Sequence, residues 1–276
     1  MNGRRAVVGL CMLCALLVSA FAAQSASAIT GTTAFTCVKT TADPNQFADP
    51  HCKEEVPTGG EYKHSVVPQD TTTSIRGNDS GPGAEAVSKL KSTVGGLAVT
   101  LTAEELEGGP NSWMTNAVDP NGEHYTHGEG TIKYTGVTVS VAKCFVYKDE
   151  GGVKGEKEKV DTEPLKATTT GQGMGLKFEP KEGTVFARFW ILDAAKKTSA
   201  EGGECNIGAT YEVTGSVIGT PEGATVSFTH SGTTTQNTLK MGAKAGIEGK
   251  LTIEGEDTED QTDTWRPLST TTVTTN

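Results

Sequence analysis

Short runs in which every second residue is apolar recur along the chain and constrain its fold most strongly. Leu97, Val99 and Leu101 follow this pattern, which predicts a half-buried strand because successive side chains of a strand point to opposite faces. Val185 to Leu192 is apolar at both parities, which predicts a central strand that is covered on both sides. No stretch keeps a helical period long enough for an α/β fold, so we expect an all-β protein.

The spacing of these runs predicts about ten or more short strands. We expect them to form a β-sandwich, which is either jelly-roll-like or an open barrel. The 34 glycines supply turns between them. Polar composition predicts a linker at Gln69–Gly83 and a long loop at Gly108–Gly130. We also expect one short helical turn at Ala84–Lys91. The apolar parity changes at Gly136, which predicts a bulge or a strand end there.

The N-terminus has the three parts of a cleavable signal peptide. Arg4 and Arg5 precede an apolar run from Ala6 to Ala23, and Ala26-Ser27-Ala28 offers small residues to the signal peptidase. The alternative is an uncleaved anchor, but the run is short for a span and the A-x-A end favours cleavage after Ala28. We therefore expect an exported, extracellular protein with no membrane span in the mature chain.

Three segments follow from these boundaries. We expect a signal peptide at 1–28, an N-terminal β segment with its linker at 29–83, and a main β domain at 84–276. The alternative is that 29–276 forms one domain.

Four cysteines remain after cleavage: Cys37, Cys52, Cys144 and Cys205. An even number in an exported chain predicts two disulfides, and of the three possible pairings we favour Cys37–Cys52 and Cys144–Cys205. The first pair brackets a loop with Asp-Pro turn signals, and the second would join two β-rich stretches. A structural zinc site is disfavoured because the mature chain has no C-x-x-C pair.

The charge of the chain disfavours nucleic acid and anionic lipid as partners. Without Arg4 and Arg5, the chain has 22 basic and 34 acidic residues, which gives a net charge of −12. Both of those partners bind through the attraction of Lys and Arg to phosphate.

Two polar segments are candidates for metal binding. His124, His127 and Glu129 lie together in a Gly-rich stretch, and imidazole and carboxylate groups suit zinc or copper. The acidic run Glu254–Asp263 offers oxygen ligands for calcium but lacks the pattern of an EF-hand. The alternative for both segments is a solvated polar loop, and we expect no bound cofactor.

Trp113 and Trp265 are candidates for a ligand surface. Both lie in polar sequence, where an exposed indole is costly unless it is covered or used, and its face can stack on a sugar ring. Trp190 lies in the most apolar run and is expected in the core.

Several segments resemble a family when they are taken together in order: Thr33–His64, Gly130–Val139, Val160–Ala167, Leu176–Ala187 and Tyr211–Gly219. They are similar to a large paralogous group of secreted, β-rich actinobacterial proteins of unknown function. The resemblance implies export, paired cysteines and a β fold, and it implies no activity.

Catalytic motifs are missing from the sequence. It contains neither a G-x-S-x-G turn nor an H-E-x-x-H helix, so we expect a non-enzymatic module for surface contact or ligand binding, with a glycan or an envelope protein as its partner. The alternatives are a secreted hydrolase with a dispersed pair of carboxylates and a purely structural protein of the cell envelope.

Overall fold

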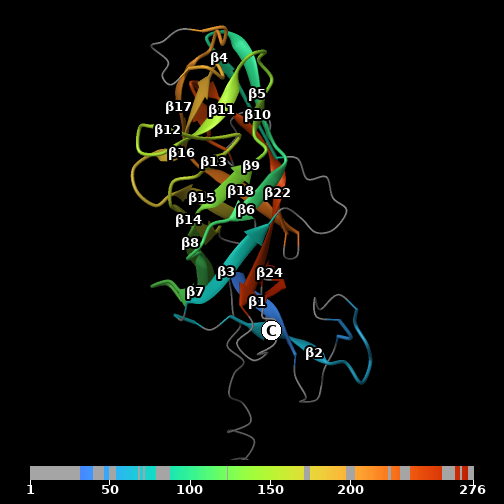
Figure 1. Ribbon diagram of the computed structural model, residues 1–276. Coiled ribbons are helices and arrows are strands. Elements are labelled where there is room, and N and C mark those ends of the chain that lie inside the picture. Colours follow the sequence, from blue (N-terminus) through green and yellow to red (C-terminus); the bar gives the residue numbers. More distant parts are fainter. Residues whose placement is uncertain are drawn as a thin grey trace, which may run out of the picture.

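The computed structural model is all-β and consists of several antiparallel sheets. It describes residues 32–39, 47–49, 54–67, 69–70, 72–78, 88–122, 124–170, 175–196, 203–222, 225–230, 237–256, 265–267 and 269–272. The molecule is elongated: β1 and β2 lie toward one end, and β4, β5 and β17 lie toward the other (Figure 1). The expected signal peptide lies outside the described residues.

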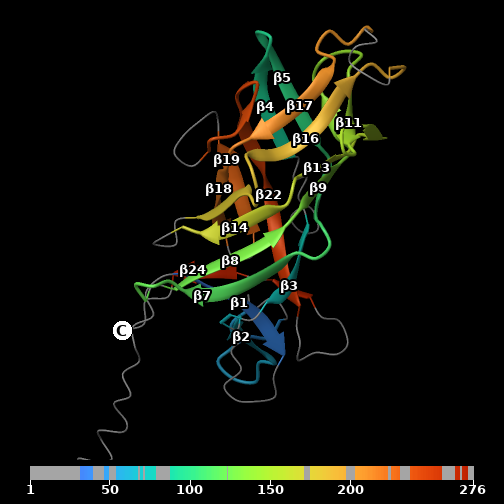
Figure 2. The ribbon, with the colours of Figure 1, turned by 90° about the vertical axis from the view of Figure 1, so that its left-hand side faces the viewer.

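Eight strands pair into a closed ring in the middle part of Figure 1, above β1 and β2. The large sheet runs in the order β22-β19-β18-β15-β14-β8-β7-β3, and an additional β22–β3 pairing joins its two ends. The strands are β3 (Thr73–Asn78), β7 (Trp113–Val118), β8 (His124–Gly130), β14 (Leu165–Thr169), β15 (Leu176–Pro180), β18 (Val217–Glu222), β19 (Thr225–His230) and β22 (Gly246–Glu256). Figure 2 shows β7, β8 and β14 side by side on one wall of this ring.

Alternation of side chains separates the inside of the ring from its outside. Met114, Leu176 and Phe178 are buried and belong to the main hydrophobic cluster. Gly128 is needed where β8 passes β7, because a Cβ atom at this position would lie 2.3 Å from the carbonyl oxygen of Trp113. The absence of a side chain thus lets the two strands approach closely.

A small sheet of order β2-β1-β24 lies against the ring, with β1 at Thr32–Lys39, β2 at Tyr62–Val66 and β24 at Ser269–Thr272. The buried amide of Asn116 connects it to β7. Asn116 accepts from the backbone N–H of Ala34 at 2.9 Å and donates to the carbonyl oxygens of Ala34 and Val67 at 3.0 and 2.7 Å. Its oxygen also accepts from the Thr126 hydroxyl at 2.7 Å, so both the oxygen and the nitrogen of the buried Asn116 amide are paired.

The upper part of the molecule consists of layered strands that extend from the ring. One end of the large sheet continues from β22 to β4 (Ser88–Val94), β5 (Leu97–Ala103) and β10 (Thr138–Val139). Its other end continues from β3 to β6 (Glu105–Gly108), β9 (Ile132–Thr135) and β13 (Val160–Asp161), and β23 (Trp265–Pro267) pairs with β22.

A six-stranded sheet of order β12-β11-β16-β17-β20-β21 forms the second layer of this part. Its strands are β11 (Phe145–Asp149), β12 (Lys154–Lys157), β16 (Val185–Leu192), β17 (Ala209–Thr214), β20 (Lys240–Met241) and β21 (Ala243–Lys244). The predicted central position of Val185–Leu192 is confirmed, since β16 lies between β11 and β17 and Phe189 and Ile191 are buried.

One of the two favoured disulfides is confirmed. Cys144 and Cys205 are bonded, and their Cα atoms lie 4.8 Å apart. The bond joins the chain just before β11 to the chain just before β17, on either side of β16. Cys37 lies in β1, opposite His64, whereas Cys52 and the side chain of Cys37 lie outside what the structure describes, so that pairing stays a prediction.

Three local expectations are wrong. The linker predicted at Gln69–Gly83 contains β3, and the helical turn predicted at Ala84–Lys91 overlaps β4. β3 pairs with β22, β6 and β7, so the hydrogen-bond ladder connects the two sides of residue 83, and the division of the chain into domains stays a prediction. The third, the loop at Gly108–Gly130, contains the candidate site described below. Gly136 has a φ of 61° and directly follows the last residue of β9, so the strand end predicted at this position is confirmed.

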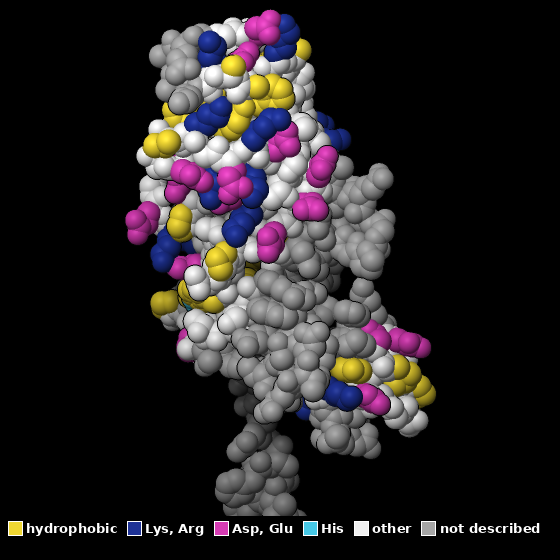
Figure 3. Space-filling view, in the orientation of Figure 1, with side chains coloured by type: hydrophobic (Ala, Val, Ile, Leu, Met, Phe, Trp, Pro, Cys, Tyr) yellow, Lys and Arg dark blue, Asp and Glu magenta, His cyan; other side chains and the backbone are white. Residues whose placement is uncertain are grey.

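The described residues form strands, turns and irregular segments, and they include no helix long and apolar enough to cross a membrane. On the face shown in Figure 3, acidic and basic side chains are intermixed.

Candidate functional site

The segment predicted as a long loop at Gly108–Gly130 is a β-hairpin formed by β7 and β8. A tight turn joins the strands: the N–H of Asn121 donates to the Asp119 carboxylate at 2.8 Å, and the N–H of Gly122 donates to the Asp119 carbonyl at 3.0 Å. Gly122 has a φ of 85°, which glycine adopts without strain. The Asp-Pro-Asn-Gly sequence is a hairpin signal, so the sequence did contain the information for this turn.

The register of the hairpin brings three of the predicted site residues together. Trp113 lies opposite Glu129, Thr115 lies opposite His127, and Ala117 lies opposite Tyr125. Residues that are opposite each other or two apart share a face of the sheet. Trp113, His127 and Glu129 therefore lie on the outer face of the ring, with Tyr125 as a fourth residue that the sequence analysis missed.

The three rings on this surface are in contact, and we call Trp113, Tyr125 and His127 the aromatic face. The His127 ring stacks on the Tyr125 ring, with centroids 5.3 Å apart and an angle of 27° between the planes. It meets the Trp113 ring edge-on at 5.6 Å and 83°. All three residues are half-buried. The short side chains of Thr115 and Ala117 leave room for the rings on this side of β7.

Charged side chains continue the same surface across β8, β14 and the end of β15. Lys181 Nζ lies 2.7 Å from Glu129 Oε2, and this hydrogen bond raises the pKa of Lys181. Lys166 lies opposite both Glu129 and Glu179 in the register, and its Nζ is 3.0 Å from Glu179 Oε1. The aromatic face is thus bordered by carboxylate and ammonium groups.

Glu179 is held in its ionised form by two lysines. Burial opposes ionisation, but hydrogen bonds from Lys177 and Lys166 outweigh it and hold the pKa of Glu179 below its ordinary value. Lys177 Nζ is 2.5 Å from Glu179 Oε2. We call Glu129, Lys166, Lys177, Glu179 and Lys181 the charged border.

His127 carries the one buried side-chain nitrogen or oxygen atom without a hydrogen-bond partner among the described residues. This atom is Nδ1. Burying a polar atom without a partner is unfavourable, and such atoms occur preferentially where another function compensates for the cost. The ring contacts with Tyr125 and Trp113 hold the imidazole in this position.

The predicted metal ligands are divided between two faces of β8. His124 has the parity of Thr126 and Gly128, which are buried, whereas His127 and Glu129 have the opposite parity. Over the described part of the chain, no group of three His, Cys, Asp or Glu side chains is arranged to hold a metal ion. The structure therefore does not bring His124, His127 and Glu129 together as one ligand set.

Trp265 and the acidic run lie elsewhere. Trp265 begins β23 and lies opposite Glu256 at the end of β22, and its side chain is outside what the structure describes. Of the run Glu254–Asp263, only Glu254–Glu256 fall in a described strand, β22. Neither segment is paired directly with β7 or β8.

The aromatic face and its border provide two kinds of contact on one surface. Aromatic rings present a flat apolar area with a partial negative charge on each face, on which C–H groups pack well. Carboxylate and ammonium groups form strong hydrogen bonds to hydroxyl groups. A pyranose ring requires both, because one of its faces carries C–H groups and its rim carries hydroxyls.

No family model, no curated protein and no solved structure matches this chain.

Proposed function

We propose that the chain is an exported, non-enzymatic carbohydrate-binding module, and that the aromatic face is its binding surface. The observation that carries the proposal is the contact of Trp113, Tyr125 and His127 on the outer face of the β7–β8 hairpin, beside an ion-paired border. A sugar ring stacks on the indole of Trp113, and its hydroxyls hydrogen-bond to Glu129 and Lys181. Export through the signal peptide, the Cys37–Cys52 bond and a sandwich-like arrangement of the layers belong to the same proposal.

The ionisation of the carboxyl groups favours binding over hydrolysis. A hydrolytic pair needs one carboxylic acid whose pKa is raised, so that it can protonate the leaving group. Among the described residues, the carboxyl groups with a shifted pKa are Glu156, Glu179 and Asp193, and all three pKa values are lowered. The lysines beside Glu179 suit it to accept hydrogen bonds from ligand hydroxyls.

The test is a glycan array probed with the oxidised protein in the presence and absence of calcium. We expect binding to a limited set of glycans, with no dependence on calcium. Trp113→Ala removes the stacking area, and we expect it to weaken binding at least about tenfold, or ~1.4 kcal/mol. Trp113→Phe keeps an aromatic face and should retain part of the affinity.

The matched control is Val153→Ala, because Val153 is 64% exposed and lies between β11 and β12, on a different sheet from the hairpin. It should bind as the unmodified protein does. An array without specific binding in either condition would contradict the proposal and would favour a structural role in the cell envelope.

A further inference from the structure

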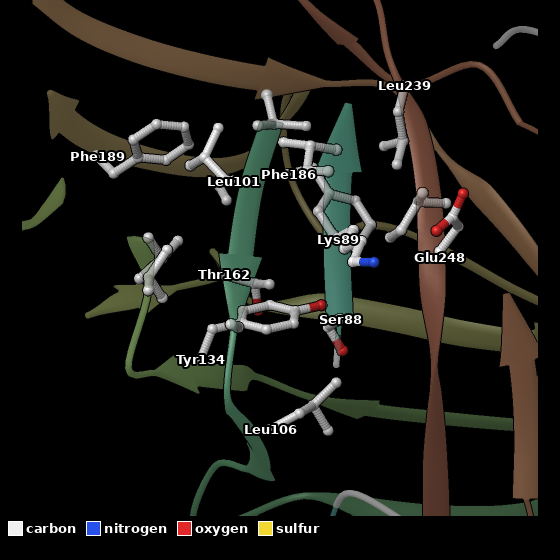
Figure 4. Close-up of a pocket in the computed structure, with 17 residues that line it drawn as sticks. Ser88, Lys89, Leu101, Leu106, Tyr134, Thr162, Phe186, Phe189, Leu239 and Glu248 are labelled. Atoms are coloured by element: carbon white, nitrogen blue, oxygen red, sulfur yellow. The ribbon is translucent and has the colours of Figure 1, made fainter. Parts of the chain in front are cut away.

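The upper part of the molecule encloses an apolar cavity between the two layers (Figure 4). Its wall is formed by β4 and β5 on one side and by β16 and β17 on the other, with β9 and β13 below. The volume that is open to the centres of water-sized molecules is about 80 Å³. Protein interiors are close-packed and leave few voids larger than a water molecule, so a space of this size is an unusual feature of a core.

The side chains that face this space are mainly apolar, and they include Leu101, Leu106, Val160, Phe186 and Phe189. Lys89 and Glu248 also border it, but their charges belong to the other face of the sheet. Their neighbours Leu90 and Ile247 lie opposite each other and pack against the core, and Lys89 lies opposite Glu248 at the alternate position. The interior of the cavity is therefore uncharged.

Two hydroxyl groups in the wall have no partner. Tyr134, in β9, lies opposite Leu106 and Val160, and within the described residues its hydroxyl forms no hydrogen bond. Ser88, at the start of β4, is 8% exposed, and its hydroxyl likewise has no partner in this part of the chain. In Figure 4 the Tyr134 hydroxyl points across the cavity toward β4, the strand that carries Ser88.

The Tyr134 hydroxyl is a hydrogen-bond donor at any physiological pH. Burial raises the pKa of Tyr134 to about 12. The ring lies deep in the protein, and its accessible surface borders the cavity. His127 Nδ1 is the one buried side-chain nitrogen or oxygen atom without a partner among the described residues, so the Tyr134 hydroxyl is accessible from the cavity, where the carbonyl oxygen of a ligand can accept its hydrogen bond.

A second apolar space, inside the ring, differs in this respect. It is bordered by Ile75, Met114, Leu165, Phe178 and Leu251. Its buried polar side chain, Ser112, donates to the carbonyl oxygen of Gly109 at 2.8 Å. The cavity in the upper part is thus the one of these two spaces in which hydroxyl groups border the open space without a partner among the described residues.

We propose that this cavity binds a small, uncharged and mainly apolar molecule that carries one carbonyl oxygen. The apolar body of the ligand packs between Leu101, Val160 and Phe189, and its carbonyl oxygen accepts hydrogen bonds from Tyr134 and Ser88. This site is separate from the aromatic face, because it lies between the layers of the upper part and shares no residue with the β7–β8 hairpin.

The test is a titration of the oxidised protein with menthone, followed by the methyl signals of Leu and Val in NMR spectra. Limonene is the matched probe, since it has a similar carbon skeleton but no carbonyl oxygen. We expect the methyl signals of Leu101, Leu106 and Val160 to shift with menthone. Those of Leu97 and Val153, which are exposed, should stay in place.

Tyr134→Phe removes the hydroxyl and keeps the ring. We expect it to weaken menthone binding about fivefold, the usual value of one hydrogen bond, and to leave limonene binding unchanged. Tyr125→Phe, on the aromatic face, is the control and should change neither affinity. Ser88→Ala serves as a second variant if Tyr134→Phe folds poorly.

Two results would overturn the proposal. One is the absence of methyl shifts at the cavity with either probe. The other is a Tyr134→Phe variant, folded as judged by its thermal unfolding, that binds menthone as tightly as the unmodified protein or loses both probes equally.

Discussion

The ring of eight strands has its binding groups on the outer face of its sheet, whereas the layered upper part has them on the inner faces of its sheets. In the ring, the buried polar side chains Asn116 and Thr126 are fully paired, and the groups available to a ligand are the rings and charges of the outer face. In the upper part, the outer face carries ion pairs such as Lys91–Glu248, and the hydroxyls of Tyr134 and Ser88, which have no partner in the described part of the chain, border the cavity inside.

This difference indicates which chemistry each region can recognise. A surface with rings beside charges suits a water-soluble ligand with many hydroxyls. An apolar cavity with two hydroxyls suits an apolar ligand with one polar group. The regions share β22, which pairs with β4 near one end and with β3 near the other, so one long strand connects both.

Loss of the Cys144–Cys205 disulfide should have the largest effect, and it should act mainly on the upper part. The bond closes a loop of 61 residues, so its removal by the Cys144→Ala, Cys205→Ala double variant should cost about 4 kcal/mol of unfolding free energy. Urea unfolding measures the total. Hydrogen exchange should show greater loss of protection in β11, β16 and β17 than in β7 and β8, and equal loss in both regions would break the distinction.

Asn116→Ala should have the next largest effect, and it should act on the ring. Asn116 is 4% exposed, and its removal takes away the acceptor of the Ala34 N–H and the donor to the Val67 carbonyl oxygen. We expect a loss of about 3 kcal/mol in urea unfolding. Asn121→Ala, at the exposed hairpin turn, is the control and should cost less than about 1 kcal/mol. A cost as small for Asn116→Ala would show that this junction is not needed for the ring.

A decrease in pH should have the smallest effect, and it should change ligand affinity at the aromatic face but not at the cavity. The pKa of Glu179 is lower in the folded protein than in the unfolded chain, so the stabilisation by its lysine contacts is present above about pH 4 and is lost as the pH falls through the folded pKa. We expect sugar affinity to fall by no more than about fivefold over this range. Menthone affinity should not change, because the ligand is uncharged and its hydrogen-bond donors, the hydroxyl groups of Tyr134 and Ser88, stay protonated over this range. Isothermal titration at several pH values, limited to conditions in which circular dichroism shows a folded protein, measures both.

The sequence predicts the strands whose apolar residues are large and regularly spaced. β5 and β16 were found in this way because Leu, Val, Ile and Phe mark their buried faces. β7 and β8 were missed because their buried faces carry Asn116, Thr126 and Gly128, which resemble loop residues in sequence. Their polar groups are tolerated in the interior because tertiary hydrogen bonds satisfy them, and those partners are distant in sequence.

The sequence indicated residues that belong to the candidate site, but it did not show which of them lie together. Trp113 was singled out for a ligand surface, and His127 and Glu129 were singled out with His124 for a metal site, because in a loop their order does not determine which side chains share a face. The hairpin register fixes that grouping and adds Tyr125. The cavity could not be predicted, since it depends on the distance between two layers and on which hydroxyls lack partners.

The most direct test of the carbohydrate site is the indole N–H region of a ¹H–¹⁵N spectrum, recorded while a glycan identified on the array is added. Trp113 and Trp190 provide a matched pair, since Trp190 Nε1 donates to the Asp149 carboxylate at 2.6 Å on a different sheet. We predict that the Trp113 signal shifts and saturates with the glycan while the Trp190 signal stays in place. A glycan that binds without shifting the Trp113 signal would contradict the account and would place the sugar elsewhere on the molecule.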